Sequence, residues 1–317
     1  MRHHHHDEEE AAQPVMASPA PAAATTSGVA TAPVSGTAVG LSPLSLPAAA
    51  QQRIDRITQG GAPAVSLSSY GDYVMLDEMG LEPVGAVVGL SIVHIGRIQL
   101  TGIKNPMELE TYSNALTLGI LNALSRVQEE ARLLGADGVL LTSVDRNNFD
   151  MEEHEYAVKG TALRFRPQPG ALHTPTGAPF VCPTSVMTLY QMARRGLAPV
   201  AVGFGVCVYH VPHRSMRQAV SQTFANLEVP VFTEGWYTAR EIALSKLESQ
   251  LQGLGAQLIL NVDVQQEAEA FGEHTSEFKA VGAGWHRHPE IQQLIPEIDL
   301  VPPALVERGA VYPTSGV

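Results

Sequence analysis

The stretch GLEPVGAVVGLSIVH, residues 80–94, decides how this chain is organised, because a second version, GLAPVAVGFGVCVYH, occupies residues 196–210. Six residues recur 116 positions later: Gly80, Leu81, Pro83, Val84, Gly89 and His94. A self-match at a fixed period predicts two versions of one structural unit. Both stretches are almost continuously apolar and rich in β-branched residues, which predicts a strand buried on both faces or lying at an interface.

Each of these strands is followed by an amphipathic helix. In the first unit its apolar positions step by three or four residues: Leu116, Ile120, Leu124, Val127, Ala131 and Leu134. The second unit repeats them 120 positions later: Trp236, Arg240, Leu244, Leu247, Leu251 and Leu254. This spacing is typical of one buried helix face. We predict Ser113 and Thr233 as N-caps, and both helices end in Leu-Gly-Ala.

Shorter segments complete each unit. Tyr70–Met79 and Val186–Arg195 read as helices that end at a glycine, which tolerates the left-handed cap conformation. Two strands close each unit, and their predicted ranges are 138–145 with 155–165, and 258–264 with 277–285. The predicted fold class is therefore α+β: two tandem β-α-β-β units, each an antiparallel sheet with a long helix on one face.

The expected domain organisation follows from these units. We predict a disordered arm over 1–62, a first unit over 63–168, a linker over 169–178, a second unit over 179–288 and a proline-containing tail over 289–317. The arm is rich in Ala, Pro, Ser and Thr and has few large apolar residues, so it cannot offset its ordering entropy. We allow for a short helix around Gln51–Ile57. The four histidines His3–His6 are either a cloning remnant or a native metal-binding tract.

Composition excludes several classes of function. The net charge is −12 and no basic stripe is present, which argues against a nucleic-acid partner. Two cysteines cannot make a disulfide framework, so a reducing compartment is expected. No apolar run reaches 18 residues, so we expect no membrane span and a cytoplasmic location. Nucleophile elbows, Walker loops and His-Glu-x-x-His motifs are missing from the sequence, and we expect no enzyme.

Several of these motifs resemble the YbjQ-like family. The matching features are the glycine-rich first strand, the Leu134–Asp137 helix end and Gly160–Ala162, with second-unit counterparts at Leu254–Gln257 and Val281–Ala283. The resemblance covers residues 80–166 and 196–285. It implies a dodecin-like unit that assembles into homo-oligomeric rings, typically pentamers, and a heavy-metal-binding label. The family supplies no catalytic residues, and this chain departs from it by fusing two units.

One candidate metal site stands out. Cys207, His210 and His213, with His94 from the first unit, offer ligands that suit a divalent transition metal such as zinc, copper or nickel. In a strand, however, Cys207 and His213 share a face and His210 points the other way. The alternative interpretation is that His94 and His210 are hydrogen-bonded strand-end histidines at an interface.

Two further histidine groups are weaker candidates. His154 lies among Glu152, Glu153 and Glu155, a composition that can bind a cation or titrate. His286 and His288 alternate at the end of the last strand and would share one face. For both groups, the alternative is a solvated loop or strand end.

The functional prediction is a non-enzymatic, ring-forming assembly or scaffold protein whose N-terminal arm recruits a protein partner. The alternatives are heavy-metal binding or sensing, and binding of a small molecule between subunits. We predict that the first strands form the oligomer interface, through Val87, Gly89, His94, Val202, Gly205 and His210.

Overall fold

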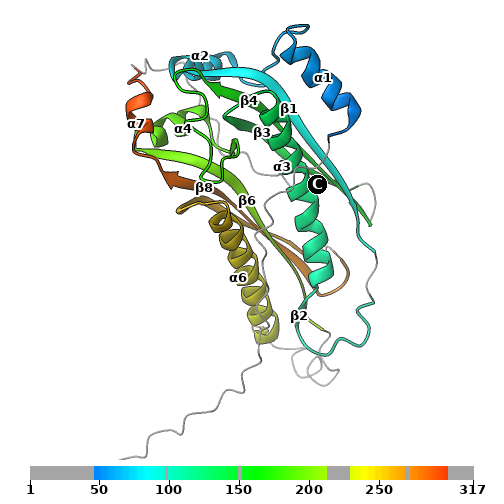
Figure 1. The fold of residues 1–317 in the computed structure, drawn as a ribbon. Helices are drawn as coiled ribbons and strands as arrows, with labels where there is room; N and C mark the ends of the chain where they lie inside the picture. The colour runs from blue at the N-terminus through cyan, green and yellow to red at the C-terminus, as the bar shows by residue number, and fades with distance from the viewer. Residues whose placement is uncertain (1–45, 97–98, 149–151, 213–228, 269–270, 299–317) are drawn as a thin grey trace, which may run out of the picture. The chain divides into compact units, whose positions relative to one another are not determined.

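The computed structural model describes residues 46–96, 99–148, 152–212, 229–268 and 271–298 (Figure 1). Its first unit contains α2 (Tyr70–Glu78), β1 (Leu81–His94), β2 (Met107–Glu108), α3 (Glu110–Leu133), β3 (Gly138–Asn148) and β4 (Glu153–Phe165). Its second unit contains β5 (Phe180–Cys182), α4 (Val186–Ala193), β6 (Leu197–His210), α6 (Pro230–Gly253), β7 (Leu258–Ala268) and β8 (Thr275–Arg287). Helices α1 (Ala48–Thr58) and α7 (Ile291–Leu294) flank them. The predicted α+β class with two β-α-β-β units is confirmed.

The two sheets have the same internal topology. Their strand orders are β1-β4-β3-β5 and β2-β6-β8-β7. In the first unit β4 lies between β1 and β3 and pairs antiparallel with both. In the second unit β8 lies between β6 and β7 in the same way. The fourth strand of each sheet comes from the other unit: β2 pairs with β6, and β5 pairs in parallel with β3. The two units therefore exchange short edge strands.

The first strands carry the same irregularity at the same place. The register between β1 and β4 shifts between Pro83 and Gly85, and that between β6 and β8 shifts between Pro199 and Ala201. Proline has no N–H to donate to the ladder, so it is confined to edges and bulges. The repeated proline thus produces a repeated bulge.

Glycine ends the helices as the sequence indicates. Gly80 and Gly196 follow α2 and α4 with φ of 77° and 71°, and Gly135 and Gly255 follow α3 and α6 with φ of 66° and 90°. These left-handed conformations suit glycine because it has no Cβ.

The predicted N-caps of the long helices are wrong. Helices α3 and α6 begin one turn earlier, with Leu109 and Val229 at the N-cap positions and no capping side chain at either. Leu109 instead donates its backbone N–H to the carbonyl of Val208. Pairing with β6 therefore sets the start of α3, and Ser113 lies inside the first turn.

Each long helix packs closely on its own first strand. A Cβ atom at Gly89 would lie 1.9 Å from the carbonyl oxygen of Ala123 in α3, and one at Gly205 would lie 1.9 Å from that of Ala243 in α6. Figure 1 shows α6 running along β6. Only glycine permits this approach of helix to strand.

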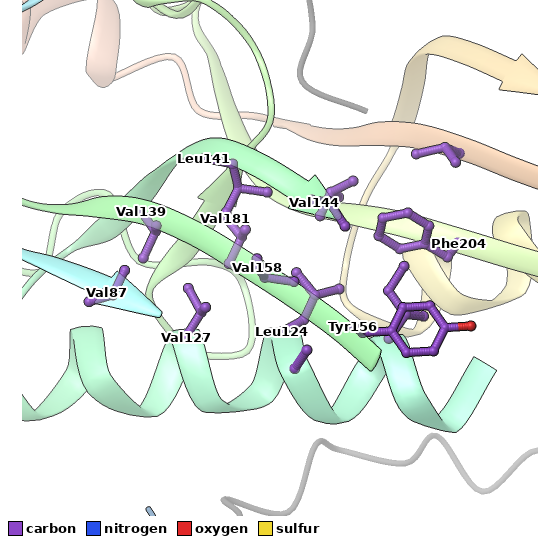
Figure 2. Packing of buried hydrophobic residues seen from close by; sticks show 14 of the residues in the cluster. Val87, Leu124, Val127, Val139, Leu141, Val144, Tyr156, Val158, Val181 and Phe204 are labelled. Carbon is purple, nitrogen blue, oxygen red and sulfur yellow. The ribbon is translucent and has the colours of Figure 1, made fainter. Parts of the chain in front are cut away.

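One hydrophobic core spans both units. It joins residues of α3, β1, β3 and β4 to four residues of β6, which are Val202, Phe204, Val206 and Val208. Figure 2 shows part of this cluster, with Phe204 among side chains such as Val144 and Tyr156 of the first unit. The opposite face of β6 packs on α6 through Cys207 and Tyr209. Strand β6 is therefore buried on both faces, as predicted.

The N-terminal arm and the C-terminal tail are described only in part. Residues 1–45 of the predicted arm lie outside the described residues, as do residues 299–317 of the tail. Within the arm, α1 includes the helix that we allowed for, and it places Ile54 in the shared core. Arg53 of the same helix binds Glu130 and the carbonyl of Ala86, so this part of the arm is ordered by packing, contrary to the prediction. In the tail, Ile291 and Ile295 are buried.

The described ranges include two helices of 24 residues, α3 and α6. None of their helices combines the length and the apolar character that a bilayer crossing requires.

Candidate functional site: the junction between the units

The outer edge of β6 is covered by the first unit. Met107 and Glu108 pair with His210 and Tyr209, and the carbonyl of Val208 accepts from the N–H of Leu109 at 2.7 Å. The N–H of Val208 donates to Ser113 Oγ at 2.9 Å. An unpaired strand edge invites pairing with other chains. Here the neighbouring unit satisfies that edge.

Helix α6 covers the rest of the same edge with side chains. Gln250 Oε1 accepts from the N–H of Phe204 at 2.7 Å, and Lys246 Nζ donates to the carbonyl of Val206 at 3.0 Å. Lys246 also forms an ion pair with Glu108 of β2. This lysine therefore links the helix of one unit to the exchanged strand of the other.

Strand β1 has the equivalent helix contacts but no exchanged strand. Glu130 Oε2 accepts from the N–H of Val88 at 2.9 Å, and Arg126 donates to the carbonyl of Leu90. These residues precede Gln250 and Lys246 by 120 positions. Among the described residues β1 lies at the end of its sheet, with β4 as its single ladder partner. The outer edge beyond Leu90 is thus open.

A buried ion pair also joins the units. Arg146 of β3 places Nη1 at 2.7 Å from both carboxylate oxygens of Glu277 in β8, and both side chains are buried. Burial is the largest influence on Arg146 and opposes its charge, but Glu277, Tyr156 and Glu267 together hold the pKa of the guanidinium above its usual value. Lys279 lies in the same cluster, and burial lowers its pKa. Buried pairs are costly to break because one charge is left uncompensated.

The predicted metal ligands do not form a metal site in the described residues. Cys207 is buried against α6, and His210 is buried with Nδ1 at 3.1 Å from Thr275 Oγ1. His94 is exposed on the other sheet, 4.0 Å from Glu152, and His213 lies outside the described residues. The described part of the chain holds no group of three or more His, Cys, Asp or Glu side chains able to bind a metal.

The chemistry of Cys207 also disfavours metal binding. Burial, reinforced by the nearby carboxylate of Glu108, raises the pKa of the thiol to about 12. The thiolate is the form that binds metals. Near neutral pH Cys207 is therefore a small apolar core residue.

The other histidine candidates have structural surroundings. His154 is buried, with Nδ1 at 2.7 Å from Asn148 Oδ1 and its ring 5.8 Å from that of Phe271. His286 and His288 do lie together, with ring centroids 5.7 Å apart. Burial, and then the neighbouring His288, lowers the pKa of His286, while His288 Nε2 lies 2.9 Å from the carbonyl oxygen of Ala171.

Of the six predicted interface residues, His94 is exposed and the other five are covered within the chain. Val87 and Gly89 are covered by α3, and Val202, Gly205 and His210 are buried inside the chain. The alternate residues of β1 point outward instead, namely Val88, Leu90 and Ile92. Strand alternation could have identified this face, because Gly89 had to face the helix.

Two proteins of known sequence are related to this chain. No family model and no solved structure matches it. Over 89 residues it is 34% identical to a UPF0145 protein of Archaeoglobus fulgidus, a match that covers 27% of this chain and 82% of that protein. UPF0145 is the YbjQ family, and the matched length is that of one unit, so one region of the chain is related to the YbjQ family.

A second relative matches over most of both chains. It is the encapsulin nanocompartment protein Rv1762c of Mycobacterium tuberculosis (strain ATCC 25618 / H37Rv), 32% identical over 248 residues. The match covers 78% of this chain and 94% of that protein. The chain belongs to the family of this mycobacterial protein.

Proposed function

We propose that this chain is a non-enzymatic, self-assembling structural protein that forms or joins a protein nanocompartment. Two findings support the proposal. Its mycobacterial relative carries the name encapsulin nanocompartment protein. The chain itself is built of two units that hold each other through exchanged edge strands and a shared core.

The observation that carries the proposal is the state of β1. Val88, Leu90 and Ile92 form a row of exposed apolar side chains on an edge strand. A long, flat, apolar edge is a liability that proteins normally cover, and contiguous exposed apolar surface marks interaction sites. Self-association would cover it.

Finer features of the assembly are part of the same proposal. The YbjQ-like resemblance implies a closed ring, with five subunits as the usual number. The Ala- and Pro-rich arm, residues 1–45 of which lie outside the described part, would recruit a protein partner. Metal binding gains no support from the described residues, so we do not propose it as the function.

The decisive experiment is a mass measurement on the full chain without an added tag. Light scattering and native mass spectrometry across micromolar concentrations should give a discrete multiple of the chain mass, and negative-stain electron microscopy should show closed particles. A single-chain mass throughout that range would overturn the proposal. Metal analysis of the same sample tests the alternative, which a stoichiometric transition metal would revive.

A further inference from the structure

We propose that copies of this chain join head to tail, with α6 and β7 of one copy docking on β1 and residues 63–67 of the next. The arrangement repeats, between chains, the junction that joins the two units within one chain. The inference rests on the proposed self-assembly and identifies the surfaces that perform it.

The two units correspond closely enough for one junction to be a template for the other. Glu130 and Gln250 accept from the N–H groups of Val88 and Phe204, residues that are 116 positions apart. The basic side chains of Arg126 and Lys246 likewise bind the carbonyls of Leu90 and Val206. Helix and strand therefore have the same relative placement in both units.

Equivalent positions of the two first strands differ sharply in burial. Val88, Leu90 and Ile92 are 38%, 48% and 60% exposed. Their counterparts Phe204, Val206 and Val208 are 1%, 2% and 0% exposed, because α3 and the rest of the first unit cover them. Within the chain the first unit covers β6, but no described unit covers β1 in the same way. In the proposed assembly the second unit of another copy takes this place.

Helix α6 offers the surface that α3 uses. Leu116 and Leu124 of α3 are buried in the shared core, while their counterparts Trp236 and Leu244 are only half-buried. Arg240 replaces Ile120, and its guanidinium lies 4.5 Å from the Tyr237 ring centroid and pairs with Glu241. Ile120 is 2% exposed in the internal junction, so the contact between copies would place the apolar stem of Arg240 at a buried position while Glu241 and Tyr237 hold its head group.

The hydroxyl that binds the strand edge is also repeated. Ser113 Oγ accepts from the N–H of Val208 across the internal junction. Thr233 is its counterpart 120 positions later and keeps a hydroxyl. We expect Thr233 of one copy to accept from the N–H of Ile92 in the next.

The exchanged strand β5 has a counterpart at the start of the first unit. The pattern Gly-Ala-Pro-x-Val at 177–181 recurs at 61–65, again 116 positions apart. Strand β5 pairs in parallel with β3, with Val181 opposite Val139. Val65 is exposed, and β7, the counterpart of β3, is an outer strand among the described residues. In the proposed junction β7 pairs with the segment around Val65, which is not a strand in the single chain.

Side-chain sizes across this pairing are complementary. In the internal junction Phe180 lies over Gly138, where a Cβ atom would come within 2.3 Å of the ring. At the equivalent positions the small and large residues are swapped: Ala64 corresponds to Phe180, and Leu258 corresponds to Gly138. Leu258 is 41% exposed in the single chain. The swap conserves the volume at the contact, which an unused surface would not require.

The orientation of the junction determines the type of assembly. Two different surfaces meet, so each copy carries one of each and the contact is heterologous. Such contacts close into a ring when the rotation allows it and otherwise extend into a filament.

The junction between copies differs from the internal one in its charges. A neutral amide, Gln266, replaces Arg146 at the position that would meet Glu155, the counterpart of Glu277. The junction between copies therefore lacks the buried ion pair.

The first test compares two equally exposed apolar residues. Ile92→Glu places a charge in the proposed contact, and Leu118→Glu places one on the solvent side of α3, where Leu118 is 56% exposed. We expect Ile92→Glu to reduce the native mass to that of one chain with an unchanged circular dichroism spectrum, and Leu118→Glu to keep the wild-type mass. If both variants keep the wild-type mass, the docking surface is overturned and self-assembly stands. A monomeric wild type would instead overturn the proposed function.

The second test reproduces the internal contact between copies. Ala64→Phe should clash with Leu258 of the neighbour and dissociate the assembly, although Ala64 is exposed in one chain. Adding Leu258→Gly recreates the Phe180–Gly138 pair and should restore the native mass. Leu258→Gly alone measures how much the assembly is weakened when the Leu258 side chain is removed and a cavity is left at the contact. Failure of the double variant to reassemble, or full assembly of Ala64→Phe, would overturn the proposed register.

Discussion

Strands β1 and β6 share a sequence pattern, a length, a proline bulge and a contact with their own helix, yet their surroundings are opposite. Strand β6 is buried on both faces and its outer edge is paired. Strand β1 is buried on one face, and among the described residues no second strand pairs with its outer edge. The difference teaches that a neighbouring unit, rather than the strand itself, determines how much of the strand is buried.

The largest effect is expected at the ion pair that only the internal junction has. Glu277→Ala leaves Arg146 with the half-exposed Glu267, 3.9 Å away, as its remaining carboxylate partner among the described residues. Losing the buried partner should lower the free energy of unfolding by about 3–5 kcal/mol. Chemical denaturation of the full chain measures it. Asp77→Ala removes one partner of the exposed pair with Arg166, which should cost only about 0.2–1 kcal/mol. Equal losses in the two variants would contradict the importance of the buried pair.

The next effect tests the feature that β1 and β6 have in common. Gly205→Ala and Gly89→Ala each push a methyl group into a helix carbonyl, and both should lose stability at the upper end of about 1–3 kcal/mol. Gly96→Ala is the control, because a Cβ there meets nothing within 4 Å, and it should change stability by about 0.5 kcal/mol or less. Thermal unfolding of the three variants decides the matter. A tolerated Gly205→Ala would mean that helix and strand are less closely packed.

A smaller effect concerns the hydroxyl at the internal junction. Ser113→Ala leaves the buried N–H of Val208 without its acceptor, which should cost about 1–2 kcal/mol. Faster hydrogen exchange at the Val208 amide would locate the loss. The exposed Ser245 of α6 provides the comparison, and Ser245→Ala should leave both stability and exchange at wild-type values.

The smallest expected effect is a pH dependence of the free energy of unfolding that arises from His286 in the second unit. Burial, with His288 beside it, lowers the pKa of His286 in the folded state, so the unfolded state binds more protons once the pH falls below the ordinary histidine pKa of about 6.5. Stability is therefore full above that pKa and declines as the pH falls towards the lowered one. Arg164 occupies the equivalent position in β4 and does not titrate in this range. Denaturation at several pH values should show that the free energy of unfolding falls less steeply at acidic pH in His286→Gln than in the wild type. An unchanged fall would mean that other groups cause it.

Much of the fold could be predicted from residue patterns. The repeat, the long helices and the glycine caps follow from spacings of 3.6 residues and from Gly80, Gly196, Gly135 and Gly255. The strands β3, β4, β7 and β8 are longer than predicted, because ladder pairing continues into polar residues that carry no apolar signal. Strands β2 and β5 have two and three residues, too few for any periodicity to reveal.

The candidate site was predicted less well than the fold. Cys207 and His210 have the side chains of metal ligands, but burial and a bond to Thr275 give them structural roles. Glu130, Arg126, Gln250 and Lys246 are surface-type residues whose role became visible only when their contacts with the strand edges were known. Their 120-residue spacing was the available signal.

By itself, the sequence determined that two related β-α-β-β units exist and where their helices end, because local periodicity and glycine conformation depend on nearby residues alone. Only the tertiary structure decided which unit covers which strand. That choice depends on contacts between residues more than a hundred positions apart, such as Ser113 with Val208 and Arg146 with Glu277. Similar local patterns therefore led to a β6 that is buried along nearly its whole length and to a β1 whose outer face remains open to a neighbour.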